Sequence, residues 1–146
     1  MIKYFEGEYT FLSNFTYCPI EYDGIRYPTN EHFFQAMKSL DREERKRIAA
    51  CETPGRAKRM GRQVELRGDW EEIKTDIMML ALRLKFSDPI FKAKLLETGN
   101  EELVEGNNWH DRTWGVCICD ECGGQGQNLL GQLLMELREE IRNENK

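Results

Sequence analysis

The sequence predicts a mainly helical α+β fold in one compact domain, residues 1–146, with short strands or a hairpin near the N-terminus. A length of 146 residues is typical of a single domain and is sufficient for a hydrophobic core. Asp23-Gly24 separates two short runs of alternating apolar and polar residues, which is a strong hairpin signal. Most of the remaining chain combines helix-capping residues with apolar residues at helical spacing.

The predicted elements follow one another in a simple order. Residues 4–15 read as irregular strand and turn, and residues 20–27 as the hairpin. Helices are expected at residues 31–38, 42–51, 54–60, 70–84, 89–97 and from about 128 onward. Thr29 or Asn30 is expected to cap the first of these helices, Thr53 the third, and Asp69 the fourth with Glu72 in a capping box. A brief strand is expected at 103–106, before a long polar loop at 107–127.

The first predicted helix carries an unusual set of polar side chains. Glu31, Gln35 and Lys38 are spaced i, i+4 and i+7, so a helix places them on one face, while Phe33 and Met37 lie on the opposite face. A carboxylic acid beside a primary amine can protonate a leaving group and attack a sugar carbon. The alternative is a solvated polar face with an ordinary Glu–Lys pair.

Two further segments suit an anionic ligand. Residues 54–62 contain four cations and no acid, namely Arg56, Lys58, Arg59 and Arg62. Not all of them can point the same way on a helix, and the alternative is a solvated basic face. The loop at 107–115 holds two tryptophans with His110 and Asp111, a combination that suits ligand stacking or, alternatively, a packed loop without a site.

The cysteines leave a metal question open. Cys117, Cys119 and Cys122 have metal-like spacing but supply only three thiols, and His110 is the nearest other candidate ligand. The alternative is reduced free thiols in a flexible loop. The glycine-rich run 123–131 is a weak anion-binding signal and an ordinary connector otherwise.

Composition limits the function classes. A net charge of -5 and a pI near 5.2 argue against a general nucleic-acid coat protein, although a local basic patch still suits a small anionic substrate. The sequence shows no signal peptide and no apolar run of membrane-spanning length. Five cysteines without a secretory signal indicate reduced thiols, so we expect a cytoplasmic protein with no membrane partner.

From about Phe5 to Arg138 the chain resembles the NADAR family, also called YbiA-like proteins. The order and spacing of many short blocks carry this resemblance, although each block is weak alone. The blocks are Phe11-Leu-Ser-Asn-Phe15, Pro19-Ile20, Asp23-Gly24, Pro28-Thr29, Glu31-His32-x-Phe34-Gln35-Ala36-x-Lys38, Ala57-x-x-x-Gly61-Arg62, Trp70, Lys85-Phe86, Leu103-Val104-Glu105, Asp111-x-x-Trp114-Gly115, Gly126-x-Asn128-x-Leu130-Gly131, Leu134-Met135 and Arg138.

The resemblance implies an N-glycosidase with a compact, mainly helical α+β domain, no cofactor and no required metal. It implies cleavage between a nitrogen and the anomeric carbon of a phosphorylated ribose, with Glu31 as the catalytic acid, Lys38 as a Schiff-base lysine and Asp111 as a third catalytic residue. The substrate would be ADP-ribosyl-guanine, free or in DNA or RNA, or a ribosylated riboflavin-pathway intermediate. Together with the residue patterns above, it gives the expected substrate-binding residues Asn14, Phe15, Gln35, Arg59, Arg62, Trp70, His110, Trp114, Gly115 and Asn128.

The cysteine cluster between Gly115 and Gly123 departs from the family pattern, in which a shorter glycine-rich stretch joins these blocks. Three other classes remain as alternatives: a non-catalytic ADP-ribose or nucleotide reader, a small zinc-dependent interaction domain, and an acyl-transfer enzyme with a cysteine nucleophile. The sequence does not fix the oligomeric state.

Overall fold

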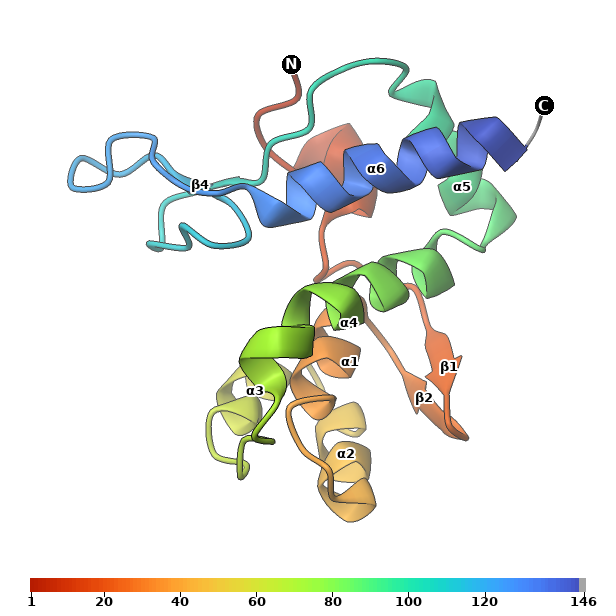
Figure 1. Cartoon of the computed structure of the whole chain (residues 1–146), viewed down its shortest axis with the longest axis vertical. Coiled ribbons are helices and arrows are strands. Elements are labelled where there is room, and N and C mark those ends of the chain that lie inside the picture. The colour runs from red at the N-terminus through yellow and green to blue at the C-terminus, as the bar shows by residue number, and fades with distance from the viewer. Residues whose placement is uncertain (145–146) are drawn as a thin grey trace. The chain divides into compact units, whose positions relative to one another are not determined.

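The computed structural model describes residues 1–144 and divides the chain into two compact units (Figure 1). Unit 1 comprises Met1–Ser13 and Asp88–Lys146, and unit 2 comprises Asn14–Ser87. The mainly helical α+β class with short strands is confirmed. The single domain over 1–146 stays a prediction, and its last two residues lie outside the described part.

Unit 2 is a small helical cluster with one hairpin. Its elements are β1 (Ile20–Tyr22), β2 (Ile25–Tyr27), α1 (Asn30–Ala36), α2 (Arg42–Ala49), α3 (Pro54–Gly61) and α4 (Trp70–Lys85). The strands pair antiparallel through Asp23-Gly24, both of which have positive φ as a tight two-residue turn requires. Helix α1 contacts α2, α3 and α4, so it forms the centre of the unit (Figure 1).

Helix α1 begins where the sequence predicts. Thr29 is the N-cap, with its side chain accepting a hydrogen bond from the backbone N–H of His32. The His32 ring donates from Nε2 to the carbonyl of Cys51 at 3.0 Å and accepts from the Thr29 hydroxyl through Nδ1 at 2.8 Å. Burial lowers the pKa of His32, which agrees with a neutral ring that joins α1 to the end of α2.

The start of α4 differs from the prediction. Asp69 occupies the N-cap position, but its side chain makes no capping hydrogen bond, so the expected capping box with Glu72 is wrong. The guanidinium of Arg67 instead donates hydrogen bonds to both carboxylate oxygens of Asp69, at 2.7 and 3.2 Å. A bidentate, charge-assisted pair outcompetes a single hydrogen bond to a backbone amide.

Unit 1 contains η1 (Gly7–Leu12, a 3-10 helix), α5 (Pro89–Glu97), β3 (Gly106–Asn107), β4 (Val116–Cys117) and α6 (Leu129–Glu144). Helices α5 and α6 contact each other (Figure 1). Strand β3 pairs in parallel with β4. The expected irregular strand and turn at 4–15 is therefore wrong for Gly7–Leu12. The strand expected at 103–106 is displaced, because Leu103 forms only an isolated bridge to Ile2.

Candidate active site

The polar face of α1 is buried. Glu31 is 8% exposed and Gln35 is 3% exposed, which contradicts the alternative of a solvated face. The Gln35 side chain donates from Nε2 to Oε1 of Glu31 at 2.8 Å, and the backbone N–H of Glu31 donates to the carbonyl of Asn14 at 3.0 Å. A buried carboxyl held by an amide is a preorganised acid or acceptor.

Lys38 lies in the turn after α1, so the helix expected over 31–38 is wrong for its last two residues. The helix ends at Ala36 with Met37 as C-cap, and the Lys38 N–H still donates to the carbonyl of Gln35 at 3.2 Å. The Lys38 Nζ lies 6.0 Å from the ring centroids of both Phe34 and Trp70. These ring faces attract the cationic form of the amine, whereas its burial favours the neutral form.

The charges around Lys38 act on its pKa in opposite directions. Burial lowers the pKa of Lys38 most strongly, Glu31 raises it, and Arg62 and Lys58 lower it further. The acid and the amine therefore lie within electrostatic range of each other, as the spacing predicts. The net shift is downward, which increases the fraction of unprotonated, nucleophilic amine at neutral pH.

Arg67 holds the backbone that carries Lys38, and no sequence motif indicated this role. The Arg67 N–H donates to the carbonyl of Lys38 at 2.9 Å, and its guanidinium donates to the carbonyl of Met37 at 3.3 Å. The Arg67 carbonyl accepts from the N–H of Trp70 at 3.3 Å. One residue thus connects the end of α1 to the start of α4, where the aromatic partner of Lys38 lies.

The cations of α3 divide between two places. Lys58 and Arg62, spaced i and i+4, are the two that influence Lys38. Arg56 and Arg59 instead line a groove with residues of the α2–α3 region, and Arg56 pairs with Glu52 at 3.1 Å. The groove is lined by Arg47, Ala50, Cys51, Glu52, Arg56, Arg59, Met60 and Gln63, and this set does not include Glu31 or Lys38. Substrate binding by Arg59 therefore stays a prediction.

Several buried polar atoms of unit 2 have no hydrogen-bond partner among residues 1–144. They are Asn14 Oδ1, Gln35 Oε1, Tyr27 Oη and both side-chain polar atoms of Asn30. Asn14 and Gln35 are predicted substrate-binding residues, whereas Asn30 was expected only as a helix cap. Buried polar atoms without a protein partner indicate bound water or a ligand. Phe15, by contrast, is 47% exposed.

The other predicted site residues belong to unit 1. Oδ1 of Asp111 accepts from the N–H groups of Thr113 and Trp114, at 3.1 and 2.9 Å, which organises the aromatic loop. Asn128 accepts from the N–H of Glu105 at 3.0 Å and donates to the carbonyl of Leu103 at 2.9 Å, so both ends of its amide are used in the fold.

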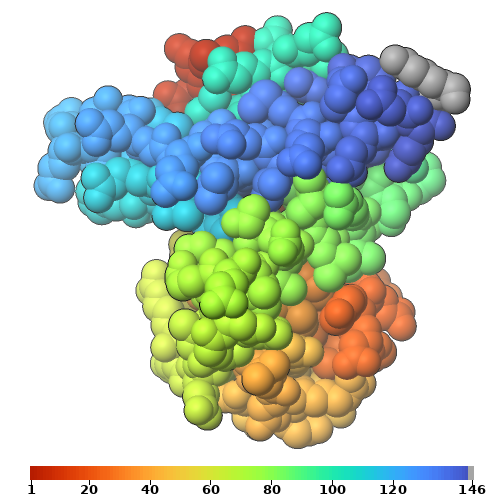
Figure 2. All heavy atoms as spheres, viewed as in Figure 1, coloured from red at the N-terminus to blue at the C-terminus, as the bar shows by residue number. Residues whose placement is uncertain are grey.

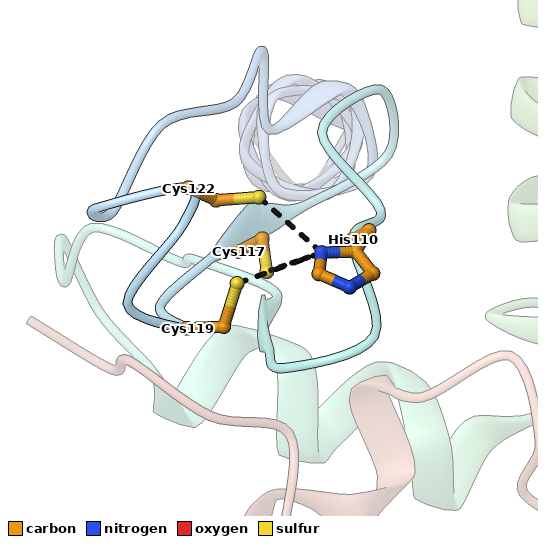
Figure 3. Close-up of side chains that lie close together, drawn as sticks. All are labelled: His110, Cys117, Cys119 and Cys122. Atoms are coloured by element: carbon orange, nitrogen blue, oxygen red, sulfur yellow. Dashed lines mark hydrogen bonds between the residues drawn. The ribbon is translucent and has the colours of Figure 1, made fainter.

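Gly115 and His110 have distinct surroundings in the same unit. A Cβ on Gly115 would lie 2.2 Å from the carbonyl oxygen of Glu105, so this position admits only glycine. Nδ1 of His110 faces three cysteine sulfurs, those of Cys117, Cys119 and Cys122 (Figure 3).

The family model described as the NADAR domain matches residues 3–142. N-glycosidase YbiA of Escherichia coli (strain K12) is 44% identical over 137 residues, covering 92% of this chain and 82% of that protein. N-glycosidase Npun_R5314 of Nostoc punctiforme is 40% identical over 143 residues, covering 92% and 87%. The Riboflavin biosynthesis protein VVA0006 of Vibrio vulnificus is 35% identical over 135 residues, covering 90% of this chain but 35% of that protein.

A solved structure agrees with these sequence matches. The NMR structure of the E. coli protein YbiA superposes with a TM-score of 0.81 and 41% sequence identity, covering 99% of this chain and 89% of that chain. Among residues 1–144, each helix is too short or too polar to cross a membrane.

Proposed function

Since this chain belongs to the NADAR domain family and is an N-glycosidase, we propose that its substrate is a phosphorylated ribose joined through its anomeric carbon to a nitrogen base. Two substrate groups fit this description: ADP-ribosyl-guanine, free or in a nucleic acid, and a ribosylated intermediate of riboflavin synthesis. The names of the relatives support hydrolysis, and they favour an enzyme over a non-catalytic reader. A cytoplasmic location stays a prediction.

The observation that carries the proposal is the environment of Lys38. Its amine is partly desolvated over Phe34 and Trp70, and it lies within electrostatic range of the buried Glu31 carboxyl. A salt bridge that served only stability would place both groups where the amine stays protonated. Here burial, Arg62 and Lys58 lower the pKa of the amine, as a nucleophile requires.

The chemistry follows from these two groups. Glu31 donates a proton to the leaving nitrogen or to the ring oxygen, and the neutral amine of Lys38 forms a bond to the anomeric carbon as the bond to the base breaks. The Glu31 carboxylate then takes a proton from the lysine nitrogen, and the bond between the anomeric carbon and the ring oxygen breaks as that oxygen is protonated, which gives an imine between Lys38 and the opened ribose. Water then adds to the imine carbon, which releases the ribose phosphate and restores the amine.

Cations and aromatic rings supply the binding energy. Arg62 and Lys58 attract the phosphate, and this remote interaction helps to position the reacting bond. Phe34 and Trp70 are each 5% exposed and pack against each other with ring centroids 5.0 Å apart, so in this proposal they position Lys38. Roles for Asp111 in orienting the ribose or activating water, and for Trp114 in stacking on the base, are also part of the proposal.

Borohydride trapping tests the covalent step. Incubation with substrate and borohydride is expected to reduce the imine and leave a sugar adduct, which peptide mass spectrometry should locate on Lys38. Substrates to compare are ADP-ribosylated guanosine, ADP-ribosylated DNA, a pyrimidine riboflavin intermediate and NAD.

The variants Lys38→Met and Lys94→Met form a matched pair, since Lys94 is an exposed lysine of α5. Only Lys38→Met is expected to lose the adduct. Turnover by the unaltered protein without any trapped adduct, or full activity in a folded Lys38→Met variant, would contradict the imine.

A further inference from the structure

Four potential metal ligands of unit 1 converge in the loop at residues 107–127. The Nδ1 atom of His110 lies 3.5 Å from Sγ of both Cys119 and Cys122, and 4.0 Å from Sγ of Cys117. All four ligand atoms lie within 4.8 Å of one another. Figure 3 shows the three sulfurs and the ring nitrogen pointing into one small space.

These separations fit a tetrahedral zinc ion. Zinc binds sulfur at about 2.3 Å and histidine nitrogen at about 2.0–2.1 Å, so a tetrahedron has N···S edges of about 3.5 Å and S···S edges of about 3.8 Å. The observed N···S distances of 3.5, 3.5 and 4.0 Å lie close to that edge. A small inward movement of the side chains is enough to coordinate the ion.

The backbone of the loop is built to present these ligands. The carbonyl of Cys119 accepts from the N–H groups of Cys122 and Gly123, at 3.2 and 2.9 Å, which makes a tight turn between two of the sulfurs. Gly123 and Gly124 continue it with φ of 60° and 81°. Cys117 pairs through its N–H with the carbonyl of Gln125 at 3.0 Å.

His110 completes the set from the other side of the loop. Its φ of 68° is uncommon for a residue other than glycine. Asn107 stabilises the segment around His110, because its side-chain amide donates to the carbonyl of Asp111 at 2.9 Å. This conformation places Nδ1 against the sulfurs. The four ligands thus come from two separate stretches, as in structural sites that close a loop.

The ligand set also indicates the kind of metal and its role. Three thiolates with one imidazole are typical of a structural zinc site, and with four protein ligands no coordination position is left for a substrate. A disulfide would use only two of the sulfurs and would not account for the histidine. We propose that His110, Cys117, Cys119 and Cys122 bind one Zn²⁺ in a closed tetrahedral site that stabilises the 107–127 loop.

The proposed zinc is separate from the chemistry of Lys38. It supplies no step of the hydrolysis, and it gives His110 a role as ligand rather than as a substrate-binding residue. Figure 2 shows the loop, in cyan to light blue, as a surface lobe beside the first turns of α6. The same loop contains Asp111 and Trp114, so the ion would hold the backbone on which these predicted site residues lie.

Metal analysis of the purified full-length protein tests the proposal directly. The protein is prepared under reducing conditions without chelators or metal-affinity steps, and elemental analysis is expected to give about one zinc per chain. Modification of the thiols by a mercurial reagent should release that zinc. A content below about one tenth per chain, even after incubation with Zn²⁺, would overturn the site, and iron in its place would overturn the metal assignment.

Variants and cobalt spectra test the ligands. Replacement of the metal by Co²⁺ should give the intense visible bands of a tetrahedral ion and a thiolate charge-transfer band. Cys122→Ser should weaken metal binding at least tenfold, whereas the matched control Cys51→Ser, outside the cluster, should still bind one ion. Equal binding by both variants would overturn the assignment. The zinc content per chain of the unaltered protein tests the site by itself, so the test still stands if a variant fails to fold.

Discussion

The reactivity of Lys38 depends on charges that belong to a neighbouring helix. Arg62 and Lys58 lower the pKa of Lys38, whereas Glu31 raises it. Removal of Arg62 as Arg62→Gln should therefore raise the pKa of Lys38. Since only the neutral amine attacks, the rate of borohydride trapping should reach its half-maximum at a higher pH than in the unaltered protein.

Arg56→Gln is the matched control for this shift, because it removes the same charge from the same helix. Arg56 pairs with Glu52 and lines the groove on the α2–α3 side. Its pH profile should keep the midpoint of the unaltered protein. An unchanged midpoint in Arg62→Gln, or equal shifts in both variants, would show that α3 does not set the pKa of Lys38.

Lys85 is a second lysine whose pKa is lowered, and its protonation affects the stability of the fold. It is 1% exposed at the end of α4, its Nζ lies 5.2 Å from the Phe86 ring centroid, and burial lowers its pKa to about 7. Between that pH and the ordinary value of 10.5, the unfolded chain holds the proton and the folded chain does not. Stability from this group should therefore rise with pH, by on the order of 2 to 3 kcal/mol between about pH 7 and about pH 9.

The variant Lys85→Met removes that dependence. It should be more stable than the unaltered protein at neutral pH, and its advantage should shrink as the pH rises. Urea unfolding at several pH values measures both trends, with Lys94→Met as the exposed-lysine control. If the free energy of unfolding differed by the same amount between Lys85→Met and the unaltered protein at every pH, Lys85 would not take up a proton when the chain unfolds.

At the scale of elements, the site depends on the close approach of α1 and α3. A Cβ built on Gly61 would lie 2.1 Å from Oε1 of Gln35, so any other residue where α3 passes this side chain would force the buried Gln35 amide to move. Gly61→Ala should overpack the contact and cost about 1–3 kcal/mol of unfolding free energy. Because Gln35 holds Glu31, the same change should also lower kcat, which activity assays and urea unfolding together measure.

Gly55→Ala provides the control within the same helix. The nearest atom to a Cβ there is Oγ1 of Thr53 at 3.9 Å, which is ordinary contact. Alanine favours a helix over glycine by up to about 1 kcal/mol, so this variant should be as stable as the unaltered protein or more stable. Equal stability of the two alanine variants would refute the close α1–α3 contact.

Local signals predicted most of the elements. The cap at Thr29, the Thr53-Pro54 start of α3 and the Asp23-Gly24 turn are each determined by neighbouring residues, and the structure confirms all three. The prediction was wrong where a non-neighbouring partner decides. The Asp69 carboxylate binds Arg67 instead of capping α4. The strand expected at 103–106 appears as β3 at Gly106–Asn107, because the pairing partner β4 sets its position.

The candidate site was predictable to a similar extent. Helical spacing predicted that Glu31, Gln35 and Lys38 share one face. The structure has Glu31 and Gln35 on α1 and Lys38 in the turn after it, with the acid and the amine within electrostatic range. Spacing could not show that this face is buried, nor which cations of α3 are near the amine. The backbone hydrogen bonds of Arg67 to Lys38 and Trp70 could not be predicted either, because Arg67 lies in a loop without a recognisable motif.

At the scale of the whole molecule, the NADAR match covers residues 3–142 and therefore parts of both units. The proposed catalytic pair lies in unit 2, while the proposed zinc ligands lie in unit 1. Each unit has its own internal contacts, such as the bond from Arg138 to Thr98 at 2.8 Å in unit 1. Loss of the metal should therefore act locally.

Hydrogen exchange followed by mass spectrometry tests this locality. Zinc is removed by a strong chelator, and exchange is then measured at neutral pH. Amides of the 115–125 segment, including those of Cys117 and Gly124 that are bonded within the loop, should exchange at least tenfold faster. Amides of α1 and α3 should keep their protection, because their hydrogen bonds lie in unit 2. Restored protection on adding Zn²⁺ would attribute the change to the ion, whereas faster exchange along the entire chain would show that the two units unfold together.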